Sequence, residues 1–196
     1  MELDIILSGV GGQGILSIAA VIGQAVLNNG LNIKQAEVHG MSQRGGDVQS
    51  NLRISSEKID SDLISKGGAD IVISLEPMEA LRYKQYLKPC GYLVTNSVPV
   101  VNIPTYPDIE KVYGEISAMK NAIMIDLDKI ATEIGAAKAT NMVLLGAASH
   151  FLQIDFSLLE EGVKAIFARK GEDIVGVNLL ALREGRNAAK LQLKNK

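Results

Sequence analysis

The first 30 residues hold the feature that most restricts the fold, an apolar run that leads through a glycine-rich loop into a helix. The run LDIILS at 3–8 is short and continuously apolar, which is typical of a strand buried in a parallel sheet. The loop at 9–14 reads GVGGQG. Residues 14–29 are apolar around most of a helical circumference and are followed by Gly30, which indicates a helix buried on more than one side. This order predicts an α/β sheet.

The remaining chain divides into a part with strand patterns and a part without them. Strands are predicted at 31–38, 47–55, 69–75, 91–97 and 122–127, and helices at 77–88 and 108–119. The run at 47–55 alternates polar and apolar residues, so we expect a half-exposed strand that pairs with its neighbour as a hairpin. A turn is expected at Pro89–Gly91, and residues 98–107, which contain three prolines, are expected to run extended.

Only helices are predicted beyond residue 128, at 128–134, 139–153, 157–169 and 173–190. We therefore predict a Rossmann-like, mostly parallel sheet over 1–127 and a C-terminal helical cluster over 128–196, together forming a single domain over 1–196.

Composition excludes several classes of function. The net charge is −2, tryptophan is absent, and no basic run exceeds a pair, so nucleic-acid binding is not expected. No apolar stretch reaches 18 residues and the N-terminus has no basic segment, so we expect no membrane span, no signal peptide and a cytoplasmic location. The single cysteine, Cys90, excludes an internal disulfide and a cysteine-ligated cluster built by this chain alone. The mean hydropathy of +0.16 is compatible with an apolar surface covered by a partner.

The first loop, 9–14, has the formal pattern G-x-G-x-x-G between a strand and a helix. Its candidate ligand-binding residues are Gly9, Gly11, Gly12, Gln13 and Gly14. Such a loop suits a phosphate or nucleotide group, an NAD cofactor, or a purely structural turn, and the pattern alone leaves these open. Glu37 lies about where a Rossmann domain places its ribose-binding acid. One feature argues against an NAD-binding domain. The second strand is followed by a polar loop and another strand, whereas a Rossmann unit has a helix at that position.

The second loop lies within 37-EVHGMSQRGGDVQSNLRI-54. Arg44 precedes two glycines, so its planar guanidinium can be presented to a phosphate or carboxylate. Gln43 offers both a donor and an acceptor, and His39 can donate, accept or titrate. The alternative is a solvated connection in which His39 caps a backbone group and Glu37 pairs with Lys34 or Arg44.

The combination of 9-GVGGQG-14 with the segment 37–54 resembles the small subunits of the thiamine-diphosphate-dependent 2-oxoacid:ferredoxin oxidoreductases. The form EVHGMSQRGG is more similar to the indolepyruvate enzymes' beta subunit than to the pyruvate enzymes' gamma subunit. Length and element order match across nearly the whole chain, and the two motifs together are specific.

This resemblance implies a larger partner subunit that carries thiamine diphosphate and the iron–sulfur clusters. The partner decarboxylates an arylpyruvate, the acyl group passes to coenzyme A (CoA), and the electrons pass to ferredoxin. The small subunit helps to bind CoA and completes the partner's active site. The resemblance implies catalytic contributions from Arg44 and Gln43, and ligand contacts from the first loop, Glu37, His39 and Asn141; no metal is held by this chain.

Other residues carry weaker signals. Thr140 and Asn141 are predicted to cap a helix, although the resemblance places Asn141 facing the first loop. Glu76 and Asn96 follow strands at the carboxyl edge of the sheet, where ligands gather. His150 is interpreted as a core histidine. Because no paired carboxylates, metal-ligand spacing or Ser–His–Asp set emerges, we expect an accessory subunit. The alternatives are a stand-alone NAD(P)-binding oxidoreductase domain and a non-catalytic nucleotide-binding regulator.

Overall fold

The computed structural model describes residues 1–39 and 45–194. Within these residues six strands form one sheet in the order β2-β3-β1-β4-β5-β6. The strands are β1 (Glu2–Val10), β2 (Asn32–His39), β3 (Asp47–Ser55), β4 (Ala69–Ser74), β5 (Leu87–Asn96) and β6 (Ala122–Ile125). The predicted α/β fold with a mostly parallel sheet is confirmed, since β1, β4, β5 and β6 pair in parallel.

The exception to the parallel pairing is β3, which runs antiparallel to both β1 and β2. The predicted hairpin of β2 and β3 is therefore confirmed. The register places Val10 at the end of β1 opposite Asp47 at the start of β3. Because β3 begins where β1 ends, the first and second loops emerge at the same edge of the sheet.

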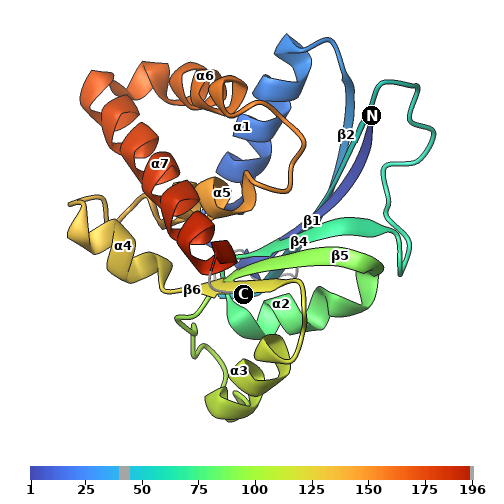
Figure 1. Ribbon diagram of the computed structural model, residues 1–196, viewed down its shortest axis with the longest axis vertical. Coiled ribbons are helices and arrows are strands. Elements are labelled where there is room, and N and C mark those ends of the chain that lie inside the picture. Colours follow the sequence, from blue (N-terminus) through green and yellow to red (C-terminus); the bar gives the residue numbers. More distant parts are fainter. Residues whose placement is uncertain (40–44, 195–196) are drawn as a thin grey trace.

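Helices cover both faces of the sheet (Figure 1). One face carries α1 (Ile15–Asn28), α5 (Thr140–Ala148), α6 (Phe156–Phe167) and α7 (Glu172–Lys194), with α4 (Leu127–Glu133) beside them. The other face carries α2 (Pro77–Tyr83) and α3 (Ile109–Ser117). The largest hydrophobic core joins β1 to α1, α5 and α7, and it includes Leu7, Ile22, Leu144 and Leu182. As its apolar circumference predicted, α1 is buried between the sheet and other helices.

Two element boundaries were predicted wrongly. The helix expected at 77–88 ends at Tyr83, and after one 3₁₀ turn β5 already begins at Leu87 and runs through the expected turn at Pro89–Gly91. Leu87 pairs with Ala69 and Tyr92 with Ile71, so residues 88–91, where the turn was expected, lie in a register shift within the strand. The helix expected at 139–153 ends at Ala148.

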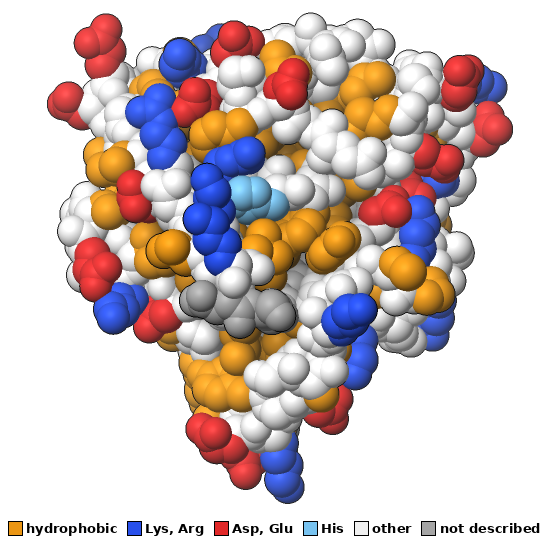
Figure 2. Space-filling model, in the orientation of Figure 1, with side chains coloured by type: hydrophobic (Ala, Val, Ile, Leu, Met, Phe, Trp, Pro, Cys, Tyr) orange, Lys and Arg blue, Asp and Glu red, His pale blue; other side chains and the backbone are white. Residues whose placement is uncertain are grey.

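The face that carries α7 also exposes apolar side chains. Figure 2 shows several hydrophobic patches on this face among scattered charged groups. Leu180, Leu191 and Leu193 of α7 are among the exposed apolar residues. None of the described helices combines the length and the apolar character that a bilayer crossing demands.

Candidate functional site at the carboxyl edge of the sheet

The first loop is stabilised by the side chain of its own glutamine. Gln13 Oε1 accepts a hydrogen bond from the Val10 backbone N–H at 2.7 Å, and its Nε2 donates to the Leu75 carbonyl at 3.1 Å. Gln13 therefore joins the end of β1 to the end of β4. Both ends of its amide are occupied inside the protein, and its predicted contact with a ligand stays a prediction.

Two glycines of the first loop have conformations that other residues rarely adopt. Gly12 has φ = +103°, and no neighbouring atom lies within 4 Å of the position of a Cβ, so its backbone is open to approach. Gly14 has φ = +87°, and a Cβ there would lie 2.7 Å from Asn141 Nδ2. Gly12 thus leaves room for a ligand, whereas Gly14 leaves room for a side chain of the protein. Gly9 and Gly11 complete the loop, and their predicted ligand contacts stay predictions.

Asn141 reaches the first loop from α5. Its Nδ2 donates to the Gly14 carbonyl at 3.1 Å, and the residue is only 9% exposed. The predicted capping role is wrong, because Ala139 is the N-cap residue of α5 and no side chain caps that helix. The structure therefore brings Asn141 to the place that the resemblance implied, facing the glycine loop.

The two loops are hydrogen-bonded to each other. The Gly11 N–H donates to the Gly46 carbonyl at 2.8 Å, and the Gly45 N–H donates to the Gly11 carbonyl at 3.3 Å. This contact was not predicted from the sequence. It follows from the antiparallel register of β1 and β3, which places the two loops next to each other.

A cavity of about 430 Å³ opens beside the first loop on the side of β2. Gly11, Gly12 and Gly14 line it together with the predicted Glu37 and His39. The expected pairing of Glu37 with Lys34 is not found, since the Lys34 ammonium donates instead to the Asp60 carbonyl. The structure thus places Glu37 and His39 in one cavity with the glycines, and their ligand contacts stay predictions.

A second cavity, of about 650 Å³, lies on the other side of the first loop. Its lining includes Gly12, Gln13 and Asn141 together with Lys138 and Lys170. Among the described residues no carboxylate lines it, although Asp128 lines an adjoining hollow with Lys138, whereas Glu37 lines the first cavity. The two sides of the loop therefore differ in charge, and the side of the lysines is the more favourable for an anion. Sequence reasoning missed Lys138 and Lys170, because no local pattern marks an isolated lysine.

Gln43 and Arg44, the predicted catalytic residues, lie outside the described residues. Two other residues predicted at the sheet edge prove to be structural. Glu76 is fully buried and caps α2 by accepting from the Glu79 N–H at 2.7 Å. Asn96 accepts from the Leu127 N–H and donates to Asp128, so it holds the start of α4.

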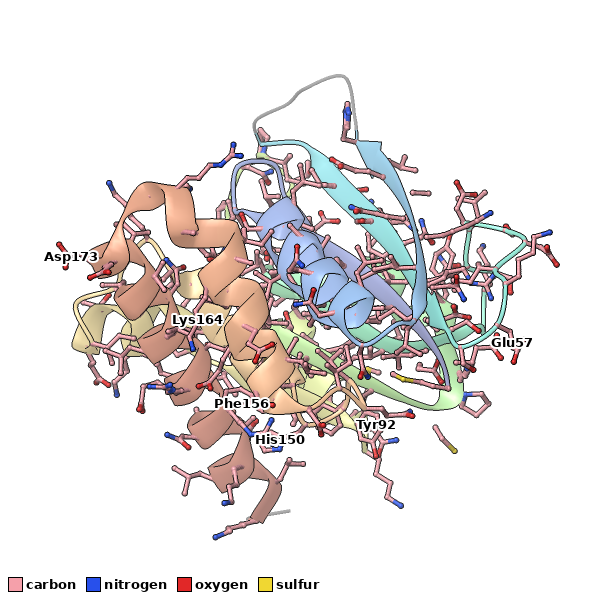
Figure 3. All side chains as sticks on the ribbon, turned by 90° about the horizontal axis from the view of Figure 1, so that it is seen from above. Glu57, Tyr92, His150, Phe156, Lys164 and Asp173 are labelled. Carbon is pink, nitrogen blue, oxygen red and sulfur yellow. The ribbon has the colours of Figure 1, made fainter. Side chains whose placement is uncertain are left out.

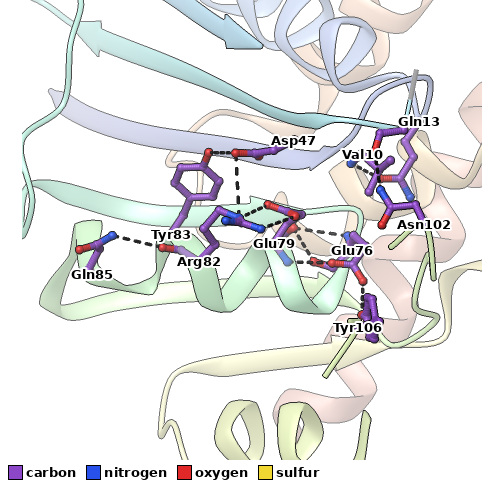
Figure 4. A network of polar contacts seen from close by, with 12 residues as sticks. Val10, Gln13, Asp47, Glu76, Glu79, Arg82, Tyr83, Gln85, Asn102 and Tyr106 are labelled. Carbon is purple, nitrogen blue, oxygen red and sulfur yellow. Dashed lines mark hydrogen bonds and ion pairs between the residues drawn. The ribbon is translucent and has the colours of Figure 1, made fainter. Parts of the chain in front are cut away.

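A polar network extends from the buried Glu76 along α2 to the partly exposed Asp47 at the start of β3 (Figure 4). Arg82 contacts Glu79 at 2.7 Å, and the Tyr83 hydroxyl donates to Asp47 at 2.8 Å. Burial, with a smaller contribution from the Asp47 carboxylate, raises the pKa of Glu79 to about 7 despite Arg82. Burial likewise raises the pKa values of Tyr83 and Tyr106, so both hydroxyls remain protonated donors.

The remaining reactive side chains lie away from this edge. His150 is only partly buried and lies after the end of α5, so it is not the core histidine that was expected; its Nε2 lies 2.9 Å from the Arg186 carbonyl, beside α7 (Figure 3). Cys90 is exposed within β5. Across residues 1–39 and 45–194, no three His, Cys, Asp or Glu side chains are grouped as metal ligands.

The fold and the loops together define a class: an open α/β domain with two joined glycine-rich loops at the carboxyl edge of its sheet. The model of the pyruvate ferredoxin/flavodoxin oxidoreductase family matches residues 4–188, and the chain belongs to this family. The resemblance seen in the sequence is thereby confirmed. The chain is a small subunit of a 2-oxoacid:ferredoxin oxidoreductase.

Relatives of similar length match over nearly the whole chain, and a longer solved protein matches over part of its own chain. The chain is 35% identical to the indolepyruvate oxidoreductase subunit IorB of Archaeoglobus fulgidus, covering 96% of both chains. It is 38% identical to IorB of Thermococcus kodakarensis, covering 98% of both. The 2-oxoglutarate:ferredoxin oxidoreductase of Magnetococcus marinus, solved with 2-oxoglutarate, CoA and succinyl-CoA bound, matches with a TM-score of 0.76 and 26% identity over 97% of this chain and 31% of that chain.

Proposed function

We propose that this chain is the small subunit of a thiamine-diphosphate-dependent indolepyruvate or arylpyruvate:ferredoxin oxidoreductase. The complete enzyme would decarboxylate the 2-oxoacid, transfer the acyl group to CoA and pass two electrons to ferredoxin. The similarity to two IorB subunits over nearly the whole chain supports the substrate class. The observation that carries the proposal is the joining of the two glycine-rich loops at one sheet edge through Gly11, Gly45 and Gly46.

A larger partner is needed because this chain has one cysteine and so cannot ligate an iron–sulfur cluster alone. In the Magnetococcus protein the matched region is 31% of a longer chain, so further parts of that enzyme lie in the same polypeptide. The edge that carries the loops exposes apolar side chains suited to a partner. Leu16 is 51% exposed, Val38 55% and Val101 69%.

CoA fits the side of the first loop that carries Lys138 and Lys170. CoA has a diphosphate and a further phosphate, so it needs cationic and N–H groups, while Glu37 would repel it from the other side. The open backbone at Gly12 lies between the two cavities and suits close approach of a phosphate. We infer that the lysine side holds the phosphates and that Glu37 and His39 face the partner subunit or the acyl end.

The test is reconstitution of the enzyme. This chain, tagged, is co-expressed with the large subunit, and the purified complex is assayed for reduction of ferredoxin with indolepyruvate and CoA. We expect activity that requires both subunits, CoA and thiamine diphosphate. A pure, assembled complex that is inactive with every arylpyruvate would overturn the substrate class. Micromolar binding of NAD by the isolated chain, without association with the large subunit, would support the NAD(P)-binding alternative instead.

A further inference from the structure

The stem of the second loop, Gly45–Asp47, is tethered by side chains from two distant segments. Asn102 Nδ2 donates a hydrogen bond to the Gly45 carbonyl. The Asp47 carboxylate accepts from the Tyr83 hydroxyl and lies 4.0 Å from the Arg82 guanidinium. These bonds are additional to those that join Gly45 and Gly46 to the first loop. The stem is therefore held on several sides at the point where Arg44 joins it in the sequence.

Asn102 belongs to the segment 98–107, named the strap here, which is anchored on each side of Asn102. It does not run extended throughout as expected, because the Tyr106 N–H donates to the Ile103 carbonyl and closes a turn. The Val100 N–H donates to Glu76 Oε1 at 3.4 Å, and the Tyr106 hydroxyl donates to the same oxygen. Because Glu76 is fully buried, this carboxylate is a fixed anchor. The two anchors hold the intervening chain so that Asn102 faces Gly45.

Helix α2 supports both tethers of the stem. Glu76, at its N-terminus, anchors the strap, and Arg82 and Tyr83, in its last turn, contact Asp47. Figure 4 shows the resulting line of contacts from Asp47 through Arg82, Glu79 and Glu76 to Tyr106, with Asn102 near Gln13 of the first loop. One rigid helix thus fixes the stem from two directions.

The strap adds little to the hydrophobic core. Val101 and Ile103, on each side of Asn102, are exposed. Burial of apolar surface therefore does not explain the packing of this segment over Glu76. A buried carboxyl group is costly unless it is hydrogen-bonded, and the strap supplies two of the hydrogen bonds of Glu76. The polar bonds of the strap are directed at Glu76 and at the second loop, which indicates a positioning task.

We propose that the strap positions the stem, Gly45–Asp47, against the first loop for the reaction, with Asn102, Tyr106 and Glu76 as positioning residues. This inference rests on the proposed function, because it assumes that the second loop contributes to the active site of the complex. None of the three residues is assigned a contact with substrate or CoA.

The experiment compares variants in the assembled complex with the large subunit. Tyr106→Phe removes only the hydroxyl that donates to Glu76, and Asn102→Ala removes the donor to Gly45. Tyr113→Phe is the matched control, because its hydroxyl donates to the Ser97 carbonyl at 2.5 Å, just before the strap, and forms no hydrogen bond to the stem residues 45–47. We expect about tenfold lower turnover for both test variants, with unchanged assembly, and wild-type turnover for the control.

A double-mutant cycle separates positioning from general stability. If the strap acts through the second loop, Tyr106→Phe will lower turnover no further when combined with Arg44→Ala. Full additivity of the two changes would overturn the inference, as would wild-type turnover of both Tyr106→Phe and Asn102→Ala in an active complex. An assembled wild-type complex that lacks all 2-oxoacid- and CoA-dependent activity would overturn the proposed function itself.

Discussion

The first loop and the stem of the second loop lie side by side but are supported by different means. The first loop is held by its own Gln13, which links Val10 to Leu75, and by Asn141 of α5, while Gly12 remains open to approach. The stem is held by side chains of α2 and the strap, which converge on Gly45 and Asp47. The difference shows that backbone open to approach and backbone tethered by distant side chains lie next to each other at this edge of the sheet.

The largest expected effect comes from closing the open backbone of the first loop. Gly12→Val places a branched side chain where no atom lies within 4 Å and at φ = +103°. The strain of this conformation costs about 1–3 kcal/mol. We expect a folded subunit that assembles with its partner but has turnover lowered by about a thousandfold, because the side chain blocks approach to the backbone. Turnover and melting temperature of the complex are the measurements.

Gly30→Val is the matched control for that substitution. Gly30 also has a positive φ, +69°, with no neighbour within 4 Å of a Cβ, but it lies after α1 at the other end of the helix. The Gly30→Val variant should lose a similar amount of melting temperature but keep normal turnover per complex. Equal activity losses in the two variants would assign the effect of Gly12→Val to strain and leave the first loop structural.

The next effect concerns the support of the stem and depends on pH. The pKa of Glu79 is raised from 4.5 to about 7, mainly by burial, so the native state retains a proton that the unfolded chain releases. The retained proton adds to the free energy of unfolding. This addition is complete below about pH 4.5 and is lost as the pH rises to 7, a change of about 3 kcal/mol. Glu79→Gln should remove this dependence, because the neutral amide cannot ionise beside Asp47.

The measurement is the free energy of unfolding of wild type and variant between pH 5 and 8. As the pH rises, the free energy of unfolding of wild type should fall relative to that of Glu79→Gln. This relative fall should level off above pH 7. Glu115→Gln, which alters an exposed ion pair with Lys84, provides the control and should give a difference independent of pH. Parallel curves for Glu79→Gln and wild type would show that Glu79 is ionised throughout this range.

Arg44 tests the second loop directly. Arg44→Ala should leave assembly intact and lower kcat/KM for CoA by about thirtyfold, because a guanidinium that pairs with a phosphate or carboxylate is lost. Arg183→Ala removes an arginine that pairs with Glu160 on α6, far from the loops in the sequence, and should have no such effect. A wild-type rate and CoA dependence for Arg44→Ala would remove this residue from the site.

The first loop could be predicted from the sequence, whereas the supports of the stem could not. The strands, α1 and the first loop were predicted because apolar runs and glycines are local signals. The supports of the stem could not be predicted, since Asn102 and Gly45 are 57 positions apart. Asn141 and Gly14 are 127 positions apart, and only the family resemblance indicated that they would meet.

Glu76 shows a different limit of sequence reasoning. Its place after a strand suggested a ligand-binding acid, yet it caps α2 and anchors the strap. Its role follows from complete burial, which no local pattern of residues around 76 reveals. The turn expected at Pro89 falls within β5, in a register shift against β4 that no local pattern specifies.

The smallest expected effect concerns the hydrogen bond between α5 and the first loop. Asn141→Ala removes the donor to the Gly14 carbonyl, and it should lower the free energy of unfolding by about 1 kcal/mol. Asn121→Ala is the control, since Asn121 Nδ2 donates to the Cys90 carbonyl at 3.2 Å on an exposed edge. If the first loop needs Asn141 to hold its shape for CoA, Asn141→Ala will also raise the KM for CoA a fewfold, whereas Asn121→Ala will not. A loss of stability with an unchanged KM would show that the loop keeps its shape through Gln13 and its glycines alone.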